Sequence, residues 1–454
     1  MMDAGRHPNI TLLTYSEVEE VSGYVGQFTA RIRKRARSVK EDLCTGCGAC
    51  EEKCPRRVVD EVFEAGMGKR KAIYRPFSQA IPNIPVIDRA NCLWFTKERC
   101  RLCEKVCPTG AIDYEQEDQI LEVQVGAIVV ATGFGMWDPV KLPQYSYGLS
   151  PNIITGLQFE RLTSAIGPTE GEILTAEGKK PERVAIIHCV GSRDENAHPY
   201  CSRICCMYAL KHAHQIRDKT DAEVYEFYMD MRAFGKAYEE FYERVQEEGI
   251  IFVRGRGAEV EVLPDGKLRV KGEDANLGRL VFVDVDLVIL ESAIEPQPDA
   301  DRVASLFGLG RTPDGWFAEA HPKLRPVETA TAGVFMAGCA QGPRDIPDTV
   351  AHAGAAALEV VRLFNQGEVT ISPTVAVVDR EACVGCGECI LACPYSAISR
   401  VEGKAEVNPA LCHGCGTCVA TCPAGAITAL HFTDEEIVAQ IDGLLGAYSV
   451  VRIP

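Results

Sequence analysis

Cysteines dominate the chemistry that this chain could perform. Eight of its 21 cysteines form two consecutive runs near the end of the chain, each closed by a proline: Cys383, Cys386, Cys389, Cys393, Cys412, Cys415, Cys418 and Cys422. Each run reads C-x2-C-x2-C-x3-C-P. Such a pair supplies four thiolates to each of two [4Fe–4S] clusters, because the fourth cysteine of each run ligates the other run's cluster. The alternatives are a disulfide framework and structural zinc, neither of which requires the doubled run with its prolines.

Glycines between these cysteines favour the same interpretation. Gly385, Gly387, Gly414 and Gly416 let the backbone turn N–H groups toward an anionic cluster, and such hydrogen bonds tune its reduction potential. The C-terminal block therefore predicts an electron-transfer domain of the two-cluster ferredoxin type.

A second block lies nearer the N-terminus and contains one irregular run. The regular run is Cys44, Cys47, Cys50 and Cys54, and the irregular one is Cys92, Cys100, Cys103 and Cys107. Standard spacing would place the first ligand of the irregular run at Lys97, so Cys92 can serve only if residues 93–99 loop out. We predict one [4Fe–4S] cluster at Cys44, Cys47, Cys50 and Cys107, and another at Cys54, Cys92, Cys100 and Cys103. The alternative is a degenerate second site with three ligands or no cluster.

Four further cysteines lie within 18 residues of one another: Cys189, Cys201, Cys205 and Cys206. They could hold a fifth cluster, with C-x3-C-C at a helix start and Cys189 at a strand end, or one or two of them could be buried small hydrophobic residues. We favour the cluster, because this spacing is an unusual way to fill a core in a cluster-rich chain. His188 is predicted to be a packing residue rather than a ligand.

Composition restricts the remaining possibilities. At 454 residues the chain exceeds what one core usually organises, and 46% hydrophobic residues suffice for several domains. No apolar run reaches about 18 residues and the first ten residues contain no apolar signal core, so we expect no membrane insertion. Thiolate-ligated clusters suit a reducing compartment, which predicts a cytoplasmic location. The net charge of -16 argues against a nucleic-acid partner.

Between the cysteine blocks the sequence alternates strand-like and helix-like segments. Buried strands are predicted at residues 126–133, 184–188, 223–229, 286–290 and 333–338, and helices at 203–217, 233–248 and 348–364. This order is typical of a parallel, doubly wound α/β layer, in which strand ends and helix starts receive a flavin or nucleotide. The candidate cofactor-binding residues lie at two such strand ends and at the helix start that follows: Ala131, Thr132, Gly133, Gly338, Cys339, Thr349 and Val350. The run VAIIHCVGSR keeps only Gly191 of a glycine-rich turn, so no NAD(P) site is expected.

Long stretches of the chain resemble the heterodisulfide reductase A-subunit family. The resemblance rests on the doubled C-terminal run and on six strings: GRHPNITLLTYSEVEEVSG, GKRKAIYRPFSQAIPN, VGAIVVATGF, CVGSRDENAHPYCSRICCMYALK, DMRAFGKAYEEFYERVQEEG and HPKLRPVETATAGVFMAGCAQGPRDIP. It implies an oxidoreductase subunit with an FAD/NAD(P)-binding, thioredoxin-reductase-like α/β core and two α+β ferredoxin domains of two [4Fe–4S] clusters each. It also implies an FAD that splits electron pairs, sending one electron toward a heterodisulfide-reducing partner and the other to ferredoxin, within a hetero-oligomer of several subunits.

The resemblance also divides the chain into segments. Residues 1–36, 119–151 and 291–372 would belong to the FAD-binding domain, and residues 37–118 to an inserted ferredoxin domain. Residues 152–290 would form a second dinucleotide-fold-like domain with the third cysteine group. Residues 373–432 would form the C-terminal ferredoxin domain, and residues 433–454 a helix and tail.

The flavin site departs from the family pattern. No strand with G-x-G-x-x-G precedes Gly5, and Cys339 stands where many flavoproteins carry the aspartate that holds the ribityl chain. We therefore expect FAD to bind a full-length form of the protein rather than this chain alone. The missing βαβ unit would lie upstream, reached through a selenocysteine codon, or on a separate chain. Two other functions stay open: a flavin-free iron–sulfur relay, and a homologous subunit of another anaerobic complex linked to acyl-CoA or quinone.

Overall fold

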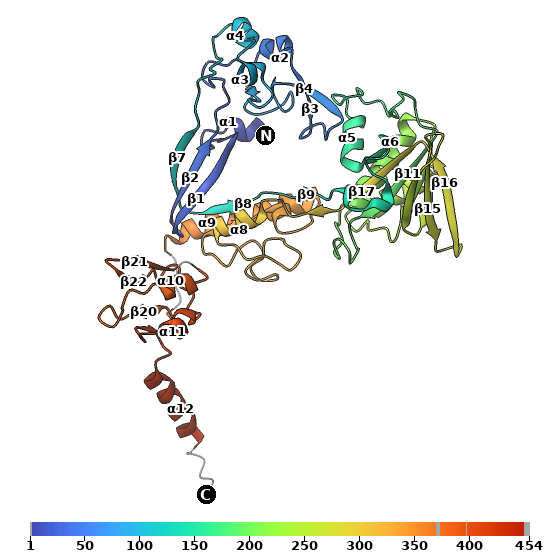
Figure 1. Cartoon of the computed structure of the whole chain (residues 1–454). Helices are drawn as coiled ribbons and strands as arrows, with labels where there is room; N and C mark the ends of the chain where they lie inside the picture. The colour runs from blue at the N-terminus through green and yellow to red at the C-terminus, as the bar shows by residue number, and fades with distance from the viewer. Residues whose placement is uncertain (1, 369–372, 396, 449–454) are drawn as a thin grey trace.

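The computed structural model describes residues 2–368, 373–395 and 397–448. After a short helix α1 (Met2–Arg6), three long strands form an antiparallel sheet in the order β1 (Ser16–Tyr24), β2 (Gln27–Lys34) and β7 (Gln119–Val125). Arg31 and Arg33 of β2 pair with Glu19 of β1, so the basic residues of β2 form a solvated sheet face. At one end this sheet joins a unit of short helices, inserted between β2 and β7 (Figure 1).

The inserted unit is built from short elements around a small core. Its elements are α2 (Ala49–Lys53), β3 (Arg57–Asp60), β4 (Gly68–Lys71), β5 (Ile73–Tyr74), β6 (Val86–Ile87), α3 (Leu93–Lys97) and α4 (Leu102–Val106). An antiparallel bridge between Val39 and Ile112 joins the two ends of the unit. Ile73, Ile87 and Tyr114 pack with buried cysteines in its core.

A five-stranded parallel sheet organises the largest core of the molecule. Its order is β10 (Ile153–Thr155), β17 (Leu287–Ser292), β11 (Arg183–Val190), β12 (Glu223–Tyr228) and β13 (Ile251–Arg254). Helices α5 (Gly156–Thr163), α6 (Cys205–Lys219) and α7 (Tyr238–Glu247) cover one face. The other face packs against an antiparallel sheet of β14 (Gly257–Val262), β15 (Leu268–Asp274) and β16 (Arg279–Val285), beside the turns η1 (Pro139–Lys141) and η2 (Pro143–Tyr145).

The parallel α/β layer is therefore confirmed, but it is not wound with helices on both faces. Alternate residues of β11 explain the two coverings: Val184 and Ile186 face the helices, whereas Ala185 and Ile187 face the antiparallel sheet. Helix α7 begins five residues later than the sequence predicts, because the left-handed backbone of Ala237 (φ +65°) interrupts the helical path.

A smaller α/β unit lies between these parts in Figure 1. Its strands β8 (Ile128–Val130) and β19 (Val334–Met336) pair in parallel, and β9 (Gly135–Met136) pairs with β18 (Ile294–Glu295). Helix α8 (Ala300–Phe307), the turn η3 (Gly338–Ala340) and helix α9 (Ile346–Gln366) complete the unit. Its core joins Val130 and Met336 of the strands to Val303 of α8.

The C-terminal unit repeats the architecture of the inserted one. It contains β20 (Ala376–Val378), α10 (Glu388–Ala392), β21 (Ile398–Val401), β22 (Lys404–Val407), α11 (Thr417–Thr421) and β23 (Ile427–Ala429). Helix α12 (Asp434–Tyr448) follows and points away from the rest (Figure 1). Across the described ranges, no helix combines the length and the apolar character needed to cross a membrane.

Candidate functional site

Each ferredoxin-like unit brings its eight cysteines to two cavities. In the inserted unit the two sets are Cys44, Cys47, Cys50 and Cys107, and Cys54, Cys92, Cys100 and Cys103. In the C-terminal unit they are Cys383, Cys386, Cys389 and Cys422, and Cys393, Cys412, Cys415 and Cys418. These are the four groups that the spacing predicts as ligand sets, and in each the fourth cysteine of a run lines the cavity of the other run. Ligation of iron by these groups stays a prediction.

Two observations bear on the alternative uses of these cysteines. All 21 are free thiols, so they form no disulfide framework. Among the described residues, no three side chains of His, Cys, Asp or Glu converge on a point that could hold a single metal ion. A multi-iron cluster separates its four ligands more widely than a single zinc ion does, so open cages of four thiols suit the cluster better.

Short helices and prolines direct the cysteines into these cages. Helices α2, α4, α10 and α11 each carry the third cysteine of a run and end at the fourth. The fourth cysteine has extended backbone in all four runs, with ψ between 109° and 121°. Because the proline that follows cannot continue the helix, the fourth side chain leaves its own run and reaches the neighbouring cavity.

Backbone N–H groups point at the sulfur atoms. The fourth cysteines Cys107, Cys393 and Cys422 each accept a hydrogen bond from the N–H four residues later, at 3.3 Å. Cys103 has an additional neighbour, because the hydroxyl of Tyr114 lies 2.9 Å from its sulfur. Donors of this kind lower the electron density on the ligand sulfur, so they would raise the reduction potential of a bound cluster. Sequence reasoning missed Tyr114.

Cys92 reaches its cavity because the residues after it form a helical turn. The expected loop over residues 93–99 is instead the short helix α3, which begins directly after Cys92. Trp94 and Phe95 of α3 pack on Tyr114, with ring centroids 5.4 and 5.9 Å apart, and this contact explains why the segment is helical rather than open. Lys97 is exposed at the end of α3 and does not line the cavity.

Two glycines are required by the C-terminal cages. Gly385 and Gly414 have φ values of +69° and +62°. A Cβ atom would lie 2.2 Å from the carbonyl oxygen of Gly403 in the first case and 2.4 Å from that of Thr374 in the second. No side chain fits at either position without moving backbone atoms.

The third cysteine group gathers where β11 ends and α6 begins. Cys189, Cys205 and Cys206 are buried, and their thiols are hydrogen-bonding neighbours. Cys201 is partly exposed, and its sulfur accepts a hydrogen bond from the backbone N–H of Arg203 at 3.3 Å. Cys189 holds an unusual positive φ of +58°. The start of α6 thus carries two of the four cysteines that the sequence selects for a fifth cluster, the end of β11 carries a third, and Cys201 lies in the segment between these elements.

Buried charges lie beneath this group. The Nε2 atom of His188 is 2.6 Å from Oε1 of Glu226, and both side chains are fully buried. Burial alone would lower the pKa of His188, but hydrogen bonds to Cys206 and Glu226 raise it well above its usual value. A hydrogen bond from Cys205, aided by the charge of His188, lowers the pKa of Cys206 to about 4. His188 therefore points to Glu226 and Cys206 from within the core.

A large cavity of about 740 Å³ opens beside the third cysteine group. Of the predicted cofactor-binding residues, Ala131, Gly133, Gly338, Cys339 and Thr349 line it, whereas Thr132 and Val350 are exposed and do not. Sequence reasoning missed a second wall, which comes from the start of α6 and the residue before it, from α7 and from the segment before α9: Ile204, Met207, Tyr208, Lys211, Tyr238 and Arg344. The apolar helical pattern of α6 contained the first three, but only the tertiary packing brings them to the strand ends.

The volume and the position of this cavity suit a flavin. The volume lies within the range of about 300–1,000 Å³ that is typical of small-molecule sites. The carboxyl ends of the parallel strands β8 and β19 and the start of α9 meet there, which is where α/β folds bind flavins and nucleotides. The N–H of Gly338 donates to Nδ1 of buried His352 at 2.9 Å, and burial lowers the pKa of His352, so a neutral imidazole holds this strand end in place.

Known proteins share both the cysteine-rich units and the rest of the chain. The 4Fe-4S dicluster domain families match residues 43–111 and 376–429. The A-subunit of the H2:CoB-CoM heterodisulfide,ferredoxin reductase of Methanothermobacter thermautotrophicus is 51% identical over 98% of this chain and 67% of its own length. The chain belongs to the heterodisulfide reductase A-subunit family.

Other members of the family give the same picture. The iron-sulfur A-subunit of the CoB–CoM heterodisulfide reductase of Methanocaldococcus jannaschii is 47% identical over 99% of this chain and 69% of its own length. The A-subunit of the H2/formate:CoB-CoM heterodisulfide,ferredoxin reductase of Methanococcus maripaludis is 46% identical, and the match covers this whole chain and 69% of the relative. This member of the family therefore spans about two thirds of the length of these relatives. A thioredoxin reductase from T. acidophilum overlaps 55% of the chain and 70% of its own, with a TM-score of 0.37 and 14% identity.

Proposed function

We propose that this chain is an electron-transfer subunit of a heterodisulfide-reductase-type oxidoreductase complex. Electrons would pass between FAD, bound at the 740 Å³ cavity, and four [4Fe–4S] clusters, or five if the third cysteine group also holds one. The names of the relatives include both the CoB–CoM heterodisulfide and ferredoxin, and we propose that this chain serves the same two acceptors together with further subunits.

The observation that carries the proposal is the position of the cysteines relative to the cavity. Helix α6 begins with Cys205 and Cys206, and its next residues, Met207 and Tyr208, line the cavity wall. A cluster at the third cysteine group would therefore lie directly behind the flavin ring. The cysteine cages of the ferredoxin-like units provide further carriers.

The chain's own residues would bind and tune these groups. Thiolates hold the clusters, and the N–H groups that point at Cys107, Cys393 and Cys422 set their potentials. The backbone ends of β8 and β19 and the apolar residues of α6 would hold the flavin ring and exclude water from it. A bound flavin supplies the chemistry of taking up electrons in pairs and releasing them singly. We propose that the pair is divided between the two acceptors.

A second candidate is a flavin-free iron–sulfur relay. No G-x-G-x-x-G turn borders the cavity in the part of the chain that the structure describes, and such a turn normally holds the pyrophosphate of FAD. The first candidate therefore assigns to the described residues the part of the flavin site that surrounds the ring.

Anaerobic purification of the protein in its native complex tests both candidates. Iron should amount to about 16 atoms per chain, from four irons in each of four cages, or about 20 with the third cysteine group. A flavin shows resolved visible bands and is released on denaturation, whereas clusters alone give a broad shoulder. An iron count near 8, or a protein without flavin, would contradict the first proposal, and the companion subunits would show whether the complex acts on a heterodisulfide, an acyl-CoA or a quinone.

A further inference from the structure

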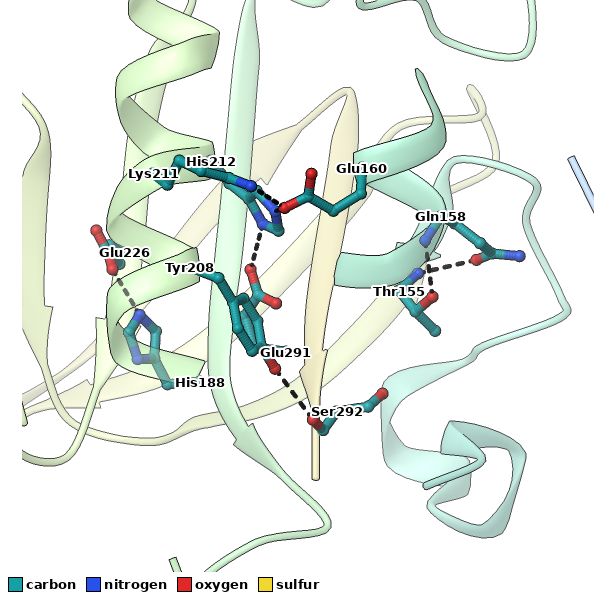
Figure 2. A network of polar contacts seen from close by, with 10 residues as sticks. All are labelled: Thr155, Gln158, Glu160, His188, Tyr208, Lys211, His212, Glu226, Glu291 and Ser292. Atoms are coloured by element: carbon teal, nitrogen blue, oxygen red, sulfur yellow. Dashed lines mark hydrogen bonds and ion pairs between the residues drawn. The ribbon is translucent and has the colours of Figure 1, made fainter. Parts of the chain in front are cut away.

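A network of four charged side chains links the core of the parallel sheet to the wall of the cavity (Figure 2). Lys211 lines the cavity, and its ammonium pairs with Oε1 of Glu160. The same Oε1 lies 2.9 Å from Nε2 of His212, and Nδ1 of His212 lies 2.9 Å from Oε1 of Glu291. His212 and Glu291 are fully buried, whereas Lys211 and Glu160 are partly exposed.

The local fold is built around the buried carboxylate of Glu291. A Cβ atom on Gly156 would lie 2.2 Å from Oε2 of Glu291, so only glycine leaves room for the carboxylate at this position. Gly156 is the first residue of α5, and Thr155 and Gln158 form a capping box there (Figure 2). The start of a helix stabilises a negative charge, and Oε2 of Glu291 lies against the first residue of α5.

His212 is the cation that balances these carboxylates. The charged and titratable groups that face it are Glu160 on α5, Glu291 on β17, and Lys211 and Tyr208 on its own helix. Burial would lower its pKa, but the charge of Glu291 and the hydrogen bond to Glu160 raise it to about 9. Glu160 is ionised near neutral pH, because its bonds to His212 and Lys211 overcome the effect of burial and lower its pKa to about 2. Two positive and two negative charges thus alternate from the core to the cavity.

We propose that His212, with Glu291 behind it, is a positioning residue that shares the Glu160 carboxylate with Lys211 and so determines how much positive charge Lys211 presents to the cavity. The proposal rests on the proposed function only in taking the occupant of the cavity to be a flavin. Two-electron reduction of a flavin with uptake of one proton adds one negative charge. When His212 is protonated, the network is neutral and does not repel the negative charge of the reduced flavin. When His212 is neutral, the network has a net charge of −1 and disfavours reduction of the flavin.

The midpoint potential of the flavin tests this role, since it is an equilibrium property rather than an activity. The native complex would be titrated with dithionite at several pH values from 6 to 10 and followed at the resolved flavin bands. In His212→Gln the potential should be more negative than in the wild type at pH 7, and the two should converge above about pH 9, where the wild-type imidazolium loses its proton. Glu291→Gln, which keeps the size of the side chain, should move the pH at which the potential falls to a lower value, because it removes a charge that holds the proton on His212.

A matched control is available on the same helix. His214 also pairs with a glutamate, because its Nδ1 lies 2.8 Å from Glu248, but it is partly exposed and does not line the cavity. His214→Gln should reproduce the wild-type potential at every pH. If flavin binds and both His212→Gln and Glu291→Gln follow the wild-type curve, the positioning role is wrong. If the wild-type protein binds no flavin, the proposed cofactor is wrong as well, so the two failures are distinguishable.

Discussion

Replacement of Cys92 by alanine is the most direct test of the irregular ferredoxin run. Cys92 shares its cavity with Cys54, Cys100 and Cys103, and each of the other three cages has its own four cysteines. Removing one of four thiolates should therefore abolish one cluster and leave the others intact. Since each cluster contains four irons, iron should fall by about four atoms per chain, from about 16 to about 12, or from about 20 to about 16 with a fifth cluster.

The assay is iron analysis together with electron paramagnetic resonance of the reduced protein. Cys339→Ala is a suitable control, because Cys339 lines the 740 Å³ cavity and lies outside the four cages, so this variant should keep all its iron. Lys97→Cys in the Cys92→Ala background should not restore the cluster, because Lys97 lies at the exposed end of α3 and outside the cage. Unchanged iron and unchanged resonance signals in Cys92→Ala would refute the ligand assignment.

Three further predictions concern other parts of the molecule. Gly414→Ala should lower the melting temperature of the loaded protein more than Gly416→Ala. Both positions have positive φ, which costs a residue with Cβ about 1–2 kcal/mol, but only at Gly414 would the new Cβ atom meet the Thr374 carbonyl. Equal effects of the two substitutions would contradict this reasoning. His212 has a pKa of about 9 in the folded protein and about 6.5 in the unfolded chain, so it should contribute about 3 kcal/mol to the free energy of unfolding. Because the folded-state pKa is raised, this contribution is fully present below about pH 6.5 and is lost as the pH rises through 9. Denaturant unfolding between pH 6 and 10 should show this decline in the wild type and not in His212→Gln. Cys386→Ser should remove about four irons from the C-terminal unit without changing the resonance signals of the inserted one.

The cysteine cages were predictable because their grouping follows from spacing along the chain. A short helix that carries the third cysteine and a proline after the fourth leave few ways to arrange a run, so C-x2-C-x2-C-x3-C-P already indicates which sulfurs meet. The parallel sheet was predictable for a similar reason, since residues 184–187 of β11 and 287–290 of β17 are continuous apolar runs. In both cases the signal lies within about a dozen consecutive residues.

The polar environment of the sites was not predictable, because it depends on contacts between distant segments. His212 meets Glu160 across 52 residues and Glu291 across 79, and no local pattern marks any of the three. The same holds for the α6 wall of the 740 Å³ cavity, whose residues look like an ordinary amphipathic helix in the sequence. Tyr114 lies only 11 residues from Cys103, but its contact with the sulfur also depends on a more distant segment, because Trp94 and Phe95 pack on its ring.

The contacts of the inserted ferredoxin unit suggest how it and the C-terminal unit differ in use. Arg161 of α5 pairs with Glu64 in the turn between β3 and β4, through two hydrogen bonds of 3.0 and 3.2 Å, and stacks on Phe63. Both charged side chains are largely buried, so the inserted unit is held against the same helix that carries Glu160 of the cavity network. The C-terminal unit instead lies beyond the end of α9 and apart from the parallel sheet in Figure 1. Electron transfer within the protein needs a short, fixed distance between carriers, so we expect the inserted unit to exchange electrons with a flavin bound in the 740 Å³ cavity. Exchange with a partner needs an accessible carrier, so we expect the C-terminal unit to meet an external carrier.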